Sequence, residues 1–263
     1  MKVVAFDLWG DYGHFRRFFT TSSPLTYSFP PPTAVRGIVG AILGLGKDAY
    51  LRATADLAVG VRLLAPVKRV RWGINLVYTK GKNDEFEPSL SKWRKKPQKK
   101  GRKYGPIHTL IKVEYLKDAR FRLYLGGESP LLDDLEALLR EHRTHYTVSL
   151  GLSELLADFA YGGTHAATAL PPGTYEVASV FPVEALDPER GLQNALQPGI
   201  KLAKERVPVY LAPDRTPVRY QDVVVEVTGR PVQVSVHEPV YQLDSGEVVY
   251  LWPPASTRIP AFR

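Results

Sequence analysis

The chain contains no cysteine, and Met1 is its only methionine. Without thiols it forms neither disulfides nor thiolate metal sites. It also lacks an apolar run near the ~20 residues that a membrane-spanning helix needs. Asp7 and Asp11 interrupt the stretch MKVVAFDLWGDYGHF before the apolar region of a signal peptide develops. These absences predict a cytoplasmic protein that does not enter a membrane.

Acidic residues are scarce in one segment, and positive charge is concentrated there. The 263-residue chain has a net charge of +8. The segment from Lys68 to Tyr104 holds 13 Lys or Arg against 3 Asp or Glu, a net of +10, so the rest of the chain sums to −2. Its densest part, KWRKKPQKKGRK from Lys92 to Lys103, has eight basic residues and no acid. Such a segment favours an anionic partner.

Aromatic residues are interleaved with this charge. Phe86, Trp93 and Tyr104 lie within or beside the basic stretch. A solvated loop is one interpretation, since most charge runs are solvated. The aromatic residues favour a second, single-stranded RNA, whose bases stack on rings while cations hold its phosphates.

The segments on either side of the basic stretch alternate between apolar and polar residues. In VKRVRWGINLVY, Val70, Trp72 and Ile74 share one face, and Arg69 and Arg71 share the other. The later segment PIHTLIKVEYL alternates in the same way. Two such strands joined by the basic stretch predict a long hairpin that projects from a sheet, and connections of that length tend to be functional or disordered.

The stretch TTSSPLTYSFPPPTAVRGIVGAILGLG predicts a helix after three prolines. Val35, Ile38, Val39 and Ile42 form an apolar stripe, and Thr33 is a candidate N-cap. Gly37, Gly40 and Gly44 share a second face. Each glycine costs about 1 kcal/mol relative to alanine in a helix, so close approach of another backbone is expected there. That backbone is either a protein strand or a nucleic acid.

Arginines and hydroxyl residues precede this helix. The stretch HFRRFFTTSS supplies Arg16, Arg17, Thr20, Ser22 and Ser23, and Arg36 falls in the first helical turn. A helix N-terminus carries partial positive charge and free N–H groups, so these residues predict a phosphate-binding site. Neither the P-loop spacing nor a dinucleotide-binding fingerprint is present.

A first strand that ends in Trp-Gly, followed by Phe-Arg and then SSPLTYSFPPPTAVRGIVGAILG, resembles the CRISPR-associated protein 5 family. The resemblance covers roughly the first 45 residues. It implies an RNA-binding subunit of a type I CRISPR surveillance complex (Cascade), and the length and valine-rich pattern resemble the type I-B branch. The basic hairpin corresponds to the thumb of that family.

The resemblance also implies a role and partners. The subunit grips the 5′ handle of the guide RNA (crRNA) and caps the complex in antiviral defence, next to a backbone subunit of the protein 7 family and a large subunit of the protein 8 family, with target DNA nearby. No cofactor and no metal site is expected. The residues predicted to contact RNA are Arg16, Arg17, Thr20, Ser22, Ser23, Tyr27, Thr33, Arg36, Gly37, Gly40, Arg69, Arg71, Lys92, Trp93, Arg94, Lys95, Lys96, Lys99, Lys100, Arg102, Lys103, Tyr104 and His108.

Two alternatives remain open at this point. One branch of the family cleaves precursor guide RNA without metal, with a tyrosine and an adjacent lysine–histidine pair. This chain has no adjacent Lys-His pair, so a ribonuclease built on it would have to use His108, Tyr104, Lys112 and Tyr50. The other alternative is a generic RNA-binding protein.

The predicted fold class is α+β. Residues 1–150 are expected to form a ferredoxin-like (RRM-like, RAMP) domain with its thumb at about residues 79–106. The segment PLLDDLEALLREHR predicts its second helix. Residues 151–263 have short valine-rich segments divided by proline and glycine, which predict a smaller antiparallel β-rich portion packed against the first.

Overall fold

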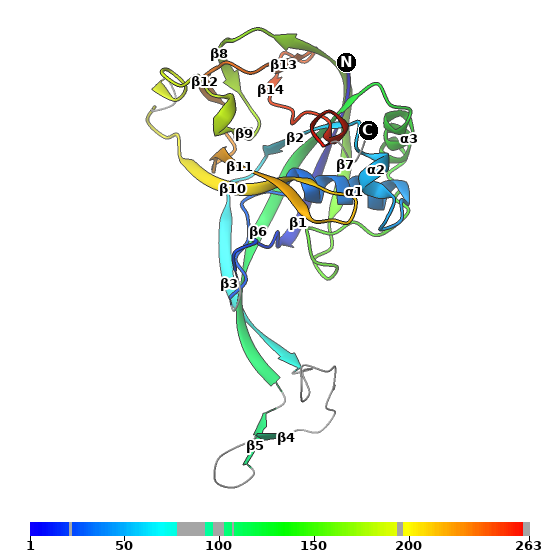
Figure 1. Cartoon of the computed structure of the whole chain (residues 1–263), viewed down its shortest axis with the longest axis vertical. Coiled ribbons are helices and arrows are strands. Elements are labelled where there is room, and N and C mark those ends of the chain that lie inside the picture. The colour runs from blue at the N-terminus through cyan, green and yellow to red at the C-terminus, as the bar shows by residue number, and fades with distance from the viewer. Residues whose placement is uncertain (21–22, 78–92, 97–102, 107, 194–196, 260–263) are drawn as a thin grey trace.

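Strand β1 (Lys2–Gly13) is apolar on both faces and lies at the centre of the fold (Figure 1). Val4, Phe6 and Leu8 belong to the main core, and Val3 and Ala5 belong to a smaller core on the opposite face. Side chains alternate along a strand, so one strand serves both layers. This computed structural model describes residues 1–20, 23–77, 93–96, 103–106, 108–193 and 197–259.

Four antiparallel strands form one end of the large sheet, in the order β7-β1-β6-β2. One helix connects β1 to β2, and another connects β6 to β7. Both helices bury apolar side chains in the core that holds Phe6 and Leu8, so they cover one face of the sheet. The elements are β2 (Ala58–Leu63), β6 (His108–Gly127), β7 (Asp158–Leu170), α1 (Pro32–Leu43) and α3 (Leu131–Arg140), with the short helix α2 (Tyr50–Ala53) after α1.

The C-terminal half extends this sheet and adds a second one. Four short strands continue the large sheet beyond β7, and a separate three-stranded sheet packs through β10 against α1 (Figure 1). None of the described helices has the length and apolar content needed to span a membrane. The elements are β8 (Gly173–Val177), β12 (Val232–Val236), β13 (Val240–Leu243) and β14 (Val248–Val249) in the first sheet, β9 (Phe181–Pro182), β10 (Leu202–Leu211) and β11 (Pro217–Glu226) in the second, and the short helices η2 (Val183–Ala185) and α4 (Ala255–Arg258).

A long hairpin, here called the arm, projects from the body (Figure 1). Strand β3 (Lys68–Val77) pairs with β6 from Lys117 to His108. Beyond them, β4 (Trp93–Lys96) pairs with β5 (Lys103–Pro106). The hairpin predicted from the alternating pattern is therefore confirmed.

Helix α1 confirms the predicted apolar stripe and corrects its start. Val35, Val39 and Ile42 are fully buried. The N-cap residue is Pro31, with no side-chain cap, and the helix begins at Pro32. The assignment of Thr33 as N-cap is wrong, because proline already has a helical φ and lacks an N–H, which suits the first helical position.

The glycine face of α1 packs against protein. A Cβ at Gly40 would lie 2.8 Å from Tyr50 Cβ, and Gly44 has a left-handed φ of +74° with a Cβ position 2.5 Å from His145 Cγ. A Cβ at Gly37 would meet nothing within 4 Å. The neighbours at Gly40 and Gly44 are the side chains of Tyr50 and His145, and not the strand backbone that was one of the two expectations.

These glycines give a matched pair of stability predictions. Gly37→Ala should raise the free energy of unfolding by up to about 1 kcal/mol, because alanine favours the helix and finds open space. Gly40→Ala should lower it, because the methyl group meets Tyr50 Cβ, which is not the flexible end of a side chain. Urea denaturation measures both. Equal effects of the two substitutions would contradict the packing described.

His14 holds the end of β1 against two neighbouring segments. Its ring is 3% exposed, its Nδ1 lies 2.7 Å from the Glu114 carbonyl oxygen, and its backbone N–H donates to the Leu150 carbonyl at 2.8 Å. Burial lowers the pKa of His14 below its usual value, because the charged imidazolium is poorly solvated there.

This lowered pKa predicts acid sensitivity. Since the unfolded chain binds the proton more tightly, the contribution of neutral His14 is complete above its unfolded pKa of about 6.5 and falls as pH drops below that value. His14→Asn, which keeps a donor but does not titrate, should be less stable at pH 7.5 and lose less stability between pH 7.5 and 5.5. Parallel stability–pH curves for both proteins would refute this.

Candidate nucleic-acid interface

The loop that follows β1 folds back on itself. The Phe15 N–H donates to Thr26 Oγ1 at 2.9 Å, and the Tyr27 N–H donates to the Phe15 carbonyl at 2.8 Å. The Arg17 N–H donates to the Leu25 carbonyl at 2.8 Å. The two sides of this segment, here called the first loop (residues 14–31), are therefore held in register, and Phe18 and Phe19 are carried toward its tip.

A buried carboxylate, Glu205 of β10, joins the first loop to the arm. Its side chain is 3% exposed. The Ser28 N–H and Oγ–H donate to it at 3.0 and 2.7 Å. Arg17 Nη2 and Arg69 Nη2 donate to Oε1 at 2.6 and 3.0 Å. Three segments distant in sequence therefore converge on one carboxylate.

Glu114 of β6 makes a second such junction. Arg71 Nε and Nη2 lie 3.1 and 3.0 Å from its Oε2, and Arg69 Nε lies 3.8 Å from Oε1. Its backbone N–H donates to the Pro24 carbonyl at 3.0 Å. Arg69 touches both carboxylates, so the two junctions form one network that fixes the first loop on the base of the arm.

The network leaves positive charge at the surface. Three arginines face two carboxylates, and the Arg71 side chain stays 65% exposed while Glu114 is 8% exposed. The carboxylates are thus turned inward and the Arg71 guanidinium outward. Lys112 and Lys117 of β6 are also exposed, and the structure gives them no ion pair among the described residues. This base presents cations that are available to an anion.

Exposed apolar side chains lie on the same part of the arm. Trp72 is 46% exposed, and its ring lies 4.5 Å from that of Tyr12 and 5.7 Å from that of Tyr115. Leu76 and Leu110 are 43% and 69% exposed. Tyr12 is directly opposite Lys117 in the β1–β6 register, so an aromatic ring and a cation stand side by side.

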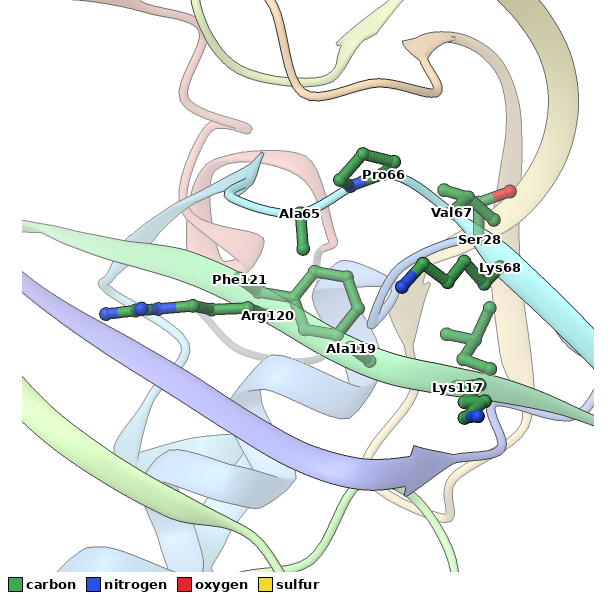
Figure 2. A pocket seen from close by; sticks show the side chains of 10 residues that line it. Ser28, Ala65, Pro66, Val67, Lys68, Lys117, Ala119, Arg120 and Phe121 are labelled. Atoms are coloured by element: carbon green, nitrogen blue, oxygen red, sulfur yellow. The ribbon is translucent and has the colours of Figure 1, made fainter.

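A shallow hollow lies next to the base of the arm (Figure 2). Three cations border it: Lys68, Lys117 and Arg120. Lys68 Nζ is 3.1 Å from Asp118 Oδ2, and Arg120 lies over the Trp9 ring at 5.3 Å while its Nη2 is 3.3 Å from Asp7 Oδ2. Its other lining residues are Ser28, Ala65, Pro66, Val67, Leu116, Ala119 and Phe121.

The structure brings some of the predicted RNA-contacting residues together. Arg17, Arg69 and Arg71 meet at the base of the arm, and Arg16 and Ser23 are exposed on the first loop. Arg16 donates through Nη2 to the Thr20 carbonyl at 2.9 Å.

Other predicted residues lie inside the protein. Arg36 is 3% exposed and donates to the carbonyls of Thr54 and Leu57, and burial lowers its pKa to about 10. Tyr27 is 2% exposed, and burial raises its pKa to about 12. Thr20 is 9% exposed and donates to the Arg17 carbonyl. The expected phosphate contact of Arg36 is therefore corrected, because its guanidinium is buried and donates to backbone carbonyls inside the protein.

The start of α1 is buried as well. Pro30, Pro31 and Pro32 are all buried, and β10 packs on the helix. A phosphate at the helix N-terminus is thus not supported by this geometry. Of the remaining predicted contacts, Ser22, Lys92, Lys99, Lys100 and Arg102 lie outside the described residues, as do the side chains of Trp93, Arg94, Lys95, Lys96, Lys103, Tyr104 and His108.

The ribonuclease candidates are spread over separate elements. Tyr50 is 9% exposed and packs on Gly40 from α2, whereas Lys112 is exposed on β6. Figure 1 shows α2 on the body, away from the arm. Within the described ranges, no group of three or more His, Asp or Glu side chains is arranged to hold a metal ion.

The ion-pair networks around Glu205 and Glu114 were not predicted from the sequence, and neither were the exposed rings of Phe18 and Phe19. The sequence did contain a signal for the ion pairs of Glu114. This residue falls on the polar side of its predicted strand, and the strand predicted to pair with it carries arginines on its own polar side. Glu205 lies in a valine-rich strand and had none. Phe18 and Phe19, between arginines and hydroxyl residues, were a visible signal for exposed rings.

Comparisons with known proteins agree with this architecture. Solved chains share its fold at low identity: a CRISPR protein from Archaeoglobus fulgidus aligns with a TM-score of 0.54 and 16% identity over 96% of this chain and 99% of that one. A chain of a CRISPR RNA-guided surveillance complex aligns with a TM-score of 0.50 and 14% identity over 99% and 98%. The search of the curated proteins gave no match.

The solved structures show the fold alone, whereas a family model identifies the family. The model described as CRISPR-associated protein (Cas_Cas5) matches residues 3–181, which is more than half of the chain and includes β1, α1, the arm and β7. The match therefore spans the first loop and the arm, whereas Glu205 of β10 lies beyond it. The chain belongs to the CRISPR-associated protein 5 family.

Proposed function

We propose that the protein is a non-catalytic RNA-binding subunit of a type I CRISPR surveillance complex. It holds the 5′ handle of the guide RNA and caps the backbone of the complex. Family membership supports the setting. One observation carries the RNA-binding role: the base of the arm presents exposed cations and an exposed tryptophan on a scaffold fixed by buried carboxylates.

The chemistry of the arm base suits a single strand. Trp72 offers a ring face on which a base stacks, and Lys112, Lys117 and Arg71 offer cations to the phosphates. The predicted basic stretch, which includes Lys95, Lys96, Lys99 and Lys100, lies between β3 and β6 in the sequence. An RNA strand that lies across the base of the arm would contact the tryptophan ring and the cations at the same time.

The body is consistent with a ferredoxin-like unit. When α2 and the arm strands β3, β4 and β5 are left out, the chain order β1-α1-β2-β6-α3-β7 and the antiparallel order β7-β1-β6-β2 support this assignment. We assign RNA binding to this unit and its arm, with the later β-rich portion packed against it. In this proposal the ferredoxin-like unit, expected to be residues 1–150, also includes β7, which pairs with β1.

The partners follow from this role. They are the guide RNA, a backbone subunit of the protein 7 family and a large subunit of the protein 8 family, with target DNA nearby. One chain of similar fold is part of a CRISPR RNA-guided surveillance complex, which supports such an assembly. The type I-B branch and the cytoplasmic location stay predictions.

Removing charge at the arm base should weaken RNA binding. Lys112→Gln with Lys117→Gln removes two exposed cations from the base. We expect lower affinity for handle RNA and a slope of log K against log salt that is shallower by about 1.4, at ~0.7 per phosphate contact on a single strand. Fluorescence anisotropy at several salt concentrations measures both quantities.

The matched control is Lys47→Gln with Arg52→Gln, which removes two exposed cations on the α1–α2 side of the body. Both double variants carry the same net charge, so only position differs. The control should keep the wild-type slope. If the two double variants lost affinity equally, binding would depend on net charge and not on the arm.

The non-catalytic role has its own test. We expect repeat RNA incubated with the purified protein in EDTA to stay intact over hours, because Tyr50 and Lys112 lie on separate elements. Gel analysis of labelled RNA measures this. Site-specific cleavage that His108→Ala abolishes would replace the proposal with the ribonuclease alternative.

A further inference from the structure

Three aromatic rings gather at the surface where the first loop meets β11. Phe18 and Phe19 are 52% and 56% exposed, with ring centroids 5.3 Å apart and planes at 89°. The Phe18 ring also lies 4.4 Å from that of Tyr220, at 44°. Here we call Phe18, Phe19 and Tyr220 the aromatic cluster. Its two phenylalanines keep about half of their surface open to solvent.

Contacts with β10 and β11 hold the aromatic cluster in place. Arg17, next to Phe18, bonds Glu205 of β10 and lies 5.7 Å from the Tyr27 ring. Tyr220 stands on β11, directly opposite Pro208 of β10. The loop and the hairpin that carry the rings are thus joined by an ion pair with a buried carboxylate, so the rings do not have to be ordered when a ligand binds.

Polar and cationic groups surround the rings. Arg16 is exposed beside them and bonds the Thr20 carbonyl. Arg206 is exposed and shares the outer face of the β10–β11 hairpin with Tyr220, because Pro208 and Arg206 are two residues apart on one strand. Val218, 52% exposed, is the apolar neighbour along β11. With Val218, the cluster comprises four residues, compared with the roughly 20–30 residues that each partner contributes to a stable protein interface.

We infer that the aromatic cluster is a stacking site for unpaired nucleobases of single-stranded RNA, with Arg16 and Arg206 facing the adjacent phosphates. Exposed ring faces beside cations are the chemistry that binds bases without reading their sequence. The inference rests on the proposed RNA-binding function and adds a contact to bases at the C-terminal hairpin, separate from the arm.

The experiment compares full-length variants by fluorescence anisotropy with a labelled single-stranded RNA of about 12 nucleotides and a matched abasic oligomer. Phe18→Leu with Phe19→Leu removes the rings but keeps apolar side chains. Phe18→Tyr with Phe19→Tyr restores rings at both positions. Val218→Thr is the control for a change at an exposed apolar residue without a ring.

The leucine variant should bind RNA about tenfold more weakly, since stacking contributes ~1–3 kcal/mol per base. Its salt slope should equal that of the wild type, because phosphate contacts are kept. The tyrosine variant and the Val218→Thr control should bind like the wild type, and the abasic oligomer should not distinguish leucine from phenylalanine.

The unexpected outcomes of this experiment can be distinguished from one another. A wild-type protein that binds neither oligomer would contradict the proposed function itself. If the wild type binds RNA and the leucine variant binds it equally well, only the stacking site is overturned. Equal RNA affinity combined with loss of assembly with a co-expressed protein subunit would likewise overturn it and identify the cluster as a protein contact.

Discussion

The interaction on which the site depends is the burial of Glu205. A carboxylate that is 3% exposed is unfavourable by several kcal/mol unless its oxygens are satisfied. Here Ser28, Arg17 and Arg69 supply donors from the first loop and from the arm. Because no single segment provides enough of them, the loop, the arm and β10 have to be in place together. The charge network thus acts as a folding constraint as well as a surface feature.

This constraint explains how the two halves of the chain share one function. Glu205 belongs to the C-terminal half, yet it fixes arginines at the base of an arm that belongs to the N-terminal half. With Glu114, it turns the acidic charge inward and leaves Arg71 and its lysine neighbours outward. A rigid base of this kind lets a flexible polyanion bind without first ordering the protein surface.

The predictable parts of the fold were those with local signals. Strand alternation predicted the arm, and helical periodicity predicted α1, because both patterns depend on residues close in sequence. The role of Arg36 was misjudged, since its exposure depends on how α1 packs against distant segments such as β10. The pairing of Glu205 with Arg17 had no local signal, because 188 positions separate them. The candidate site was therefore predictable in its charge and its hairpin, and not in its buried acids.

We expect the 5′ handle of the guide RNA to cross the base of the arm. Photo-cross-linking of handle RNA to the protein in its assembled complex, read by mass spectrometry of the peptides, tests this most directly. We expect cross-links at Trp72 and in the flanking peptides of β3 and β6. Cross-links confined to α3 on the body, with none in the arm, would contradict it.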